Sequence, residues 1–240
     1  MIISAARAAA SRLLSPPFRA VLFKSVGLTI LVLVALWFGL ESLFSAATQP
    51  LLESLMPGIP GWAGWLGMAA AIVAGIGLAL GLALLIAPVT AVVAGLFLDD
   101  VAEVIEREDF PHDAPGTALP IAASVVQSLK FFGVVIAGNL VALLLLLIPG
   151  INIAAFFLVN GYLLGREFFE FAAMRHRSAI EARAMRARNG LTVFLAGLVI
   201  AAFLSIPLVN LLTPLFAAAM MVYLHKALSA EEGSLARAAA

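Results

Sequence analysis

Long apolar runs without a charged residue alternate with short charged connections along the chain. Such runs occupy residues 25–40, 61–98, 131–147, 153–165, 191–205 and 211–224. A helix needs about 20 apolar residues to cross a hydrocarbon core of about 30 Å, and backbone polar groups in lipid must be satisfied internally. The pattern therefore predicts an all-α integral membrane protein, with residues 1–240 forming a single membrane domain.

The first two runs are long enough to cross the membrane. We expect a first span at residues 18–48, with Glu41 near its end, and a second long helix at residues 61–108. The second contains 38 consecutive uncharged residues, which at about 1.5 Å per residue exceed one upright span. Pro88 removes a backbone donor there, so we place the crossing before Pro88 and expect a kink or a tilted continuation after it.

The remaining four runs form two similar units, at residues 131–165 and 191–224, each broken by an Ile-Pro-x-x-Asn turn. The turn residues are Pro149, Gly150, Asn152, Pro207 and Asn210. Proline stops the incoming helix and asparagine can cap the outgoing one, so each unit is expected to be a helical hairpin. The arms have 17, 13, 15 and 14 residues, or about 20 to 26 Å. Such lengths favour re-entrant hairpins that penetrate partway, with four short full spans as the alternative.

Composition supports the membrane class and excludes several functions. Hydrophobic residues make up 63% of the chain and charged residues 12%, while Lys and Arg balance Asp and Glu at 14 each. A soluble domain carries about 25% charged residues, and a neutral chain offers no broad field to attract nucleic acid. With no cysteine, no P-loop, no histidine cluster and no serine-histidine-acid set, we predict no enzyme, no cofactor and no metal site. His112 and His225 are expected to be interfacial side chains.

Basic residues are distributed asymmetrically between the two sides of the predicted membrane. No Lys or Arg lies between Ser25 and Gly95, so the loop at residues 49–61 should face away from the cytoplasm. Both termini are then cytoplasmic, in a bacterial inner membrane and in one orientation. The basic N-terminal region and its apolar core are too long for a signal peptide, so we expect this segment to be retained.

Two cytoplasmic connections carry opposite charge. The first is acidic, and Glu103, Glu106 and Arg107 are candidates for an internal network that gates an ion path; the alternative is a solvated helix end, with Glu103 and Arg107 paired at i and i+4. The second is basic, with Glu181 its acidic residue among Arg175, Arg177, Arg183, Arg186 and Arg188. We expect this basic connection to face anionic lipid headgroups.

The N-terminal segment contains the candidate anion site. Residues 1–15 mix arginine with alanine and leucine, which suits a short helix at the membrane interface. After Pro16 and Pro17, Arg19 falls in the first turn of the first span, where free N–H groups and a cation could bind an anion; Lys24 follows at the mouth of the span. Interfacial snorkelling explains both side chains equally well.

Taken together, these residues resemble the CysZ family of bacterial sulfate permeases. The resemblance rests on the segment from Pro16 to Lys24, Ala87-Pro88, both Ile-Pro-x-x-Asn turns, Glu167-Phe168-Phe169-Glu170-Phe171 and Arg186-Ala187-Arg188. It implies two long helices with two pairs of hemi-penetrating helices, homo-oligomers, and import of sulfate for cysteine biosynthesis without ATP hydrolysis.

The resemblance also implies one site. Arg19 matches the first of two adjacent anion-binding arginines in the family, while Ala20 stands at the second position, so Lys24 is the candidate for the missing charge. Two functions remain open from the residues themselves: an oxyanion permease, or a structural membrane scaffold without transport. An intramembrane enzyme ranks third, because the apolar runs hold no paired carboxylates or histidines.

Overall fold

The computed structural model describes most of the chain as helix. It covers residues 1–55, 65, 69, 72–73, 75–81, 89, 93, 95–118, 120, 126, 133, 152–206 and 209–238. Within these residues every regular element is a helix, which agrees with the predicted all-α class. The chain divides into two compact units, one made of residues 1–24 and 94–240 and the other of residues 25–93.

The first unit is built around α9 (Thr213–Ala238). Helices α1 (Ile2–Arg12), α4 (Leu98–Asp109) and α6 (Asn152–Met174) all pack against it. From Leu215 to Val222 every side chain of α9 is buried, which is how a helix that is apolar on all sides behaves inside a bundle. This surrounded helix forms the centre of the core of the first unit.

Helix α2 (Pro16–Leu55) contains the clearest candidate membrane span. The stretch from Pro16 to Ala46 is 31 residues long, and in the part of the chain with a described structure it is the single unbroken helix with the length and apolarity to cross a bilayer. Large apolar side chains are exposed along it, Ile30, Leu31 and Phe38 among them. Exposed apolar side chains over this length are what a lipid-facing helix requires.

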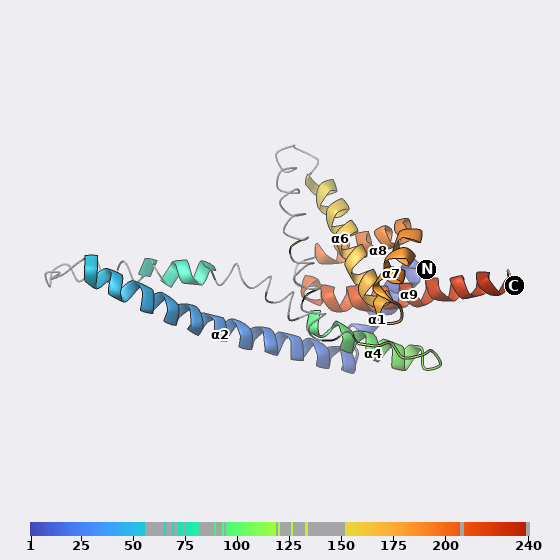
Figure 1. Cartoon of the computed structure of the whole chain (residues 1–240), viewed down its shortest axis with the longest axis horizontal. Helices are drawn as coiled ribbons and strands as arrows, with labels where there is room; N and C mark the ends of the chain where they lie inside the picture. The colour runs from blue at the N-terminus through green and yellow to red at the C-terminus, as the bar shows by residue number, and fades with distance from the viewer. Residues whose placement is uncertain are drawn as a thin grey trace. The chain divides into compact units, whose positions relative to one another are not determined.

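Glycines allow α6 and α8 (Gly190–Leu204) to approach closely. A Cβ atom added to Gly197 of α8 would lie 1.9 Å from the carbonyl oxygen of Gly161, and one added to Gly165 would lie 2.6 Å from that of Val193. Only a residue without a side chain fits such backbone contacts, as in the small-xxx-small packing of membrane helices. Figure 1 shows α6 and α8 side by side, and their crossing fixes the position of the next residue, Arg166.

Helix α7 (Ala179–Arg188) connects α6 to α8 and meets α8 at an angle of 90°. It begins with a capping box, in which the Ser178 hydroxyl accepts from the Glu181 N–H and the Glu181 carboxylate accepts from the Ser178 N–H. The cap satisfies two donors that the first turn would otherwise leave unpaired. Asn189 ends α7 and precedes α8, so the two helices share one corner.

The structure modifies the hairpin predictions in one respect. Helix α6 begins at Asn152 but runs on to Met174, beyond the uncharged arm that ends at Gly165. Charged side chains end an apolar segment without ending a helix, because the backbone hydrogen bonds continue. Pro149, Gly150 and Pro207 lie outside the described residues, whereas Asn210 lies in the short 3-10 helix η2 (Val209–Leu212). The choice between re-entrant hairpins and full spans stays a prediction, as does most of the helix expected at residues 61–108.

Candidate functional site: two ionic clusters and a basic pocket

The first ionic cluster is centred on Glu106, on the buried face of α4. Its carboxylate accepts from Arg175 Nε at 3.0 Å and Nη2 at 2.9 Å, and lies 2.9 Å from His176 Nε2. A second carboxylate, Asp99, also accepts from Arg175. The side chain of Arg175 is only 2% exposed and that of Glu106 only 7%. Two carboxylates thus face one guanidinium and one imidazole in a nearly dry site.

Backbone groups complete the Glu106 cluster. The chain that follows α4 passes over the carboxylate, where the Gly116 N–H donates to Glu106 Oε2 at 3.1 Å and the Thr117 N–H donates to the Arg175 carbonyl at 2.8 Å. A Cβ atom on Gly116 would lie 2.8 Å from both carboxylate oxygens. A side chain at this position would therefore displace the Glu106 carboxylate from the backbone N–H.

The environment of Glu106 holds its carboxyl group ionised. Burial alone would raise its pKa, but hydrogen bonds from His176 and Arg175 and the charge of Arg175 outweigh burial and hold the pKa well below its usual range. The pKa of Arg175 is raised: burial opposes this, and the bonds to Glu106 and Asp99 overcome it. Both partners of this pair are thus charged throughout the physiological range.

The second ionic cluster is centred on Glu170 of α6. Its carboxylate lies 2.8 Å from Arg186 Nε, 3.4 Å from Arg166 Nε and 3.7 Å from Arg183 Nε. Glu170 is 9% exposed, whereas the three arginines range from 23% to 63%. One carboxylate faces three guanidinium groups, so the cluster carries an excess of two positive charges.

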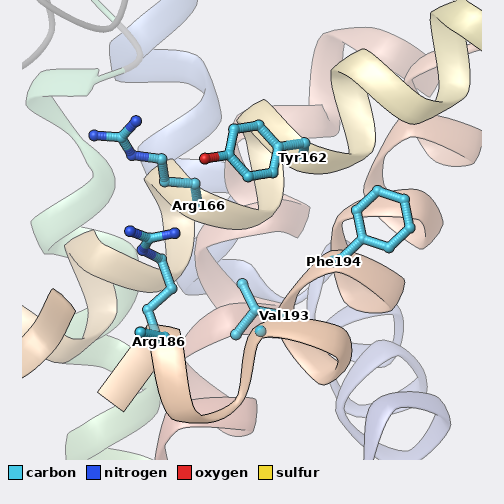
Figure 2. A pocket seen from close by; sticks show the side chains of 7 residues that line it. Tyr162, Arg166, Arg186, Val193 and Phe194 are labelled. Atoms are coloured by element: carbon cyan, nitrogen blue, oxygen red, sulfur yellow. The ribbon is translucent and has the colours of Figure 1, made fainter. Parts of the chain in front are cut away.

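A pocket of about 240 Å³ adjoins the Glu170 cluster at the corner between α7 and α8. Its walls come from α6, from the end of α7 and from the start of α8, and are formed by Tyr162, Arg166, Arg186, Ala187, Gly190, Val193 and Phe194. Figure 2 shows the guanidinium groups of Arg166 and Arg186 on the same side of the pocket, with the Tyr162 hydroxyl directed toward Arg166. No carboxylate belongs to the lining.

The basic connection differs from its expected role at the headgroups. All five of its arginines pair with carboxylates of the protein: Arg175 with Glu106 and Asp99, Arg183 and Arg186 with Glu170, Arg177 and Arg188 with Glu232. The prediction that this segment faces lipid is wrong for Arg175, because a 2% exposed side chain cannot reach headgroups. Its partners lie 69 and 76 residues away along the chain, so local charge spacing gave no indication of them.

The residues of the acidic connection separate by helical face. Glu103 and Arg107 lie 3.9 Å apart, but both are about two-thirds exposed, whereas Glu106 faces the core beside Val101 and Ile105. An exposed pair of this kind contributes little to stability. The structure therefore places only Glu106 of the three in a buried cluster, and a gating role for them stays a prediction.

Other acidic residues of this connection bind basic residues from α1 and α9. Arg12 donates to Glu108 at 2.5 Å and also to Asp109, which accepts from the Tyr223 hydroxyl as well. Lys226 donates to Asp113 at 2.9 Å. These bonds connect the end of α4 and the chain after it to α1 and α9.

Arg19 and Lys24 project from the first turns of α2 and are exposed. Neither side chain has an ion pair with any residue described in the structure. The expected contribution of free helix N–H groups is wrong, however. Prolines 16 and 17 have no N–H, the Arg19 N–H donates to the Ser15 carbonyl at 2.9 Å, and Phe18 is fully buried. Any anion at this position would be held by side chains.

The expectation that His225 is interfacial is also wrong. Its side chain is 2% exposed and stacks on His176, with ring centroids 5.4 Å apart, because α9 is the central helix. Burial, followed by the nearby charge of His176, lowers the pKa of His225 to about 3. His112 is exposed. Across the described residues no group of three or more potential metal ligands comes together.

Every regular element of the described residues is a helix, and α2 has the length and apolarity to cross a bilayer, as in α-helical membrane proteins. The sequence matches the family described as sulfate transporter CysZ/etoposide-induced protein 2.4 over residues 5–214, and the chain belongs to this family. The match confirms the resemblance drawn from the turns and the N-terminal segment. No curated protein matches the chain closely enough to add a named relative.

Proposed function

We propose that the chain is an oxyanion permease whose substrate is sulfate, supplied for cysteine biosynthesis without ATP hydrolysis. The observation that carries this proposal is membership, over residues 5–214, of a family whose description names a sulfate transporter. The bilayer is its environment, and the proposal includes a homo-oligomer in the inner membrane of a bacterium. The alternative, a scaffold without transport, shares the fold but predicts no uptake.

Arg19 is the proposed anion ligand at the cytoplasmic or vestibular end of α2. Most other arginines of the described chain form an ion pair with a carboxylate, whereas Arg19 and Lys24 have no ion pair among the described residues and lie on the apolar helix α2 itself. An unpaired guanidinium can bind two oxygens of a tetrahedral anion in a fixed geometry. Five residues along a helix correspond to a rotation of about 140°, so Lys24 adds charge from a different side of α2.

Uptake of radiolabelled sulfate by proteoliposomes, with no ATP present, tests the proposal. We expect uptake above that of empty liposomes, and a reduction of about tenfold in Arg19→Ala if one charge-assisted contact is lost. Arg7→Ala is the matched control, because Arg7 is equally exposed and unpaired but lies on α1. Equal uptake by wild type and Arg19→Ala removes Arg19 from the mechanism, and no uptake by wild type favours the scaffold.

The proposed orientation has its own test, which the cysteine-free sequence makes simple. A single Ser54→Cys substitution places a thiol in the segment expected to face away from the cytoplasm. We expect a membrane-impermeant maleimide to label it in intact cells and to leave an Ala8→Cys thiol unlabelled until the cells are opened. Labelling of both thiols in intact cells would show that the protein inserts in two orientations.

A further inference from the structure

We propose that the pocket between α6, α7 and α8 is a second oxyanion site, separate from Arg19, which binds a tetrahedral sulfate or phosphate group through Arg166, Arg186 and Tyr162. The proposal takes only its first probe, sulfate, from the proposed function. Its support is the chemistry of the pocket, where two arginines and a tyrosine line one cavity.

The charge around the pocket favours a bound anion. Glu170 neutralises one of the three arginines around it, and the two that line the pocket present guanidinium groups to an opening with no carboxylate in its walls. By contrast, Arg175, the buried arginine of the described structure, pairs with two carboxylates, Glu106 and Asp99. An uncompensated excess of positive charge beside a cavity favours occupation by an anion.

The geometry of the hydrogen-bond donors also favours a tetrahedral anion. Arginine presents planar, paired N–H groups that match two oxygens of sulfate or phosphate, and the Tyr162 hydroxyl, directed toward Arg166, adds a further donor. Donors that converge from α6 and α7 suit a tetrahedral ligand better than a planar carboxylate. The space of about 240 Å³ far exceeds the roughly 10–15 Å³ that one water molecule requires, so the anion can enter with part of its hydration shell.

The start of α8 also favours an anion, because it borders the same pocket at Gly190. Asn189 precedes this helix, but its side chain makes no capping hydrogen bond. The side-chain amide donates instead to the Met185 carbonyl at 3.0 Å. The N–H groups of Gly190, Leu191 and Thr192 therefore have no acceptor among the described residues. The partial positive charge at this end of the 15-residue helix adds to the charge of the arginines.

Two sources could supply the group that the pocket binds: free sulfate or phosphate from solution, or the phosphate of an anionic lipid headgroup. Both have the same tetrahedral oxygens, and the pocket chemistry does not depend on which is bound. A binding experiment separates them, because free sulfate can be titrated into detergent micelles that contain no lipid.

The experiment measures the dissociation constant of sulfate for purified protein in dodecyl maltoside, by calorimetric titration, and repeats it with phosphatidylglycerol added to the micelles. We expect Arg186→Gln and Arg166→Gln each to weaken binding by about tenfold, as for loss of one charge-assisted contact. Arg188→Gln is the control, because it removes an arginine from α7 that pairs with Glu232 outside the pocket. Its dissociation constant should equal that of wild type.

Tyr162→Phe keeps the proposal testable if an arginine variant fails to fold, since it removes one hydroxyl and leaves the ring in place. It should weaken binding by about threefold to tenfold. Competition by phosphatidylglycerol in wild type, lost in Arg186→Gln, would identify the lipid phosphate as the occupant and still support the pocket. Equal affinity of wild type, Arg186→Gln and Tyr162→Phe for sulfate and for the lipid would overturn it.

Failure of this proposal and failure of the permease proposal give different results. Sulfate binding that depends on Arg186, without any uptake by proteoliposomes, keeps the pocket and refutes the permease. Uptake that depends on Arg19 but is unchanged in Arg186→Gln, together with unchanged sulfate and lipid binding, keeps the permease and refutes the pocket.

Discussion

The Glu106 and Glu170 clusters are built from the same residue types, carboxylates and arginines, but in opposite proportions. In the Glu106 cluster, two carboxylates face one arginine whose side chain is 2% exposed, and a backbone N–H donates to Glu106. Around Glu170, three arginines that are 23% to 63% exposed surround one carboxylate beside a pocket. A buried cluster of paired charges fixes how helices pack, whereas a positive and partly open cluster is suited to hold a ligand.

The largest effect is expected from removing the guanidinium of the buried Glu106 cluster. Arg175→Met leaves the 7% exposed Glu106 carboxylate without its guanidinium partner, and breaking a buried pair in this way costs about 3–5 kcal/mol. The free energy of unfolding, measured by circular dichroism during titration of micelles with dodecyl sulfate, should fall by that amount. A change below about 1 kcal/mol, the value for exposed pairs, would show that the two clusters do not differ in this respect.

A smaller loss is expected from separating the helices that form the pocket without altering any charge. In Gly165→Ala the added Cβ would lie 2.6 Å from the Val193 carbonyl oxygen, which belongs to the backbone and cannot rotate away. We expect a loss of about 1–3 kcal/mol, as for overpacked cores, together with weaker sulfate binding. Gly190→Ala is the control, because nothing lies within 4 Å of its added Cβ. Equal stability of the two variants would contradict the close helix contact.

The clusters could be predicted from the sequence only in part. The all-α class, the long helix of residues 18–48 and the family followed from run lengths and turn motifs, because these signals are local. The partners of Arg175 did not, since they lie 69 and 76 residues away. Two local signals were nevertheless present: Val101, Ala102 and Ile105 define an apolar face that includes Glu106, and Gly161 and Gly165 have the spacing of a close helix crossing.

Acid should lower the stability that the Glu106 cluster contributes, because the pKa of Glu106 is held below its usual range. A carboxyl group with a lowered pKa in the folded state contributes stability that is present above its unfolded pKa and is lost as the pH falls below it. The loss from this group is at most about 1.4 kcal/mol per pH unit and begins near the ordinary glutamate value of 4.5. Glu106→Gln should unfold with a shallower dependence on pH below that value; an unchanged slope would mean that Glu106 is not ionised in the folded protein.

The smallest effect on stability is expected at the positive cluster. Glu170→Gln frees three partly exposed arginines, and because water can solvate them we expect a loss of less than about 1 kcal/mol. The same change removes a negative charge next to the pocket, so affinity for sulfate should rise severalfold in the calorimetric titration. Weaker binding by this variant would indicate that Glu170 is needed mainly to position Arg166 and Arg186.

The distance along the chain between Glu106 and Arg175 also affects how the protein is made. Glu106 leaves the ribosome 69 residues before its partner, which at about 5–20 residues per second means a delay of about 3–14 s. During this interval the Glu106 carboxylate lacks the guanidinium that accompanies it into a dry environment, and hydration is the more favourable state. The acidic segment should therefore wait in the cytosol while the first predicted hairpin is inserted, and docking of Arg175 would be a late step in the assembly of the bundle.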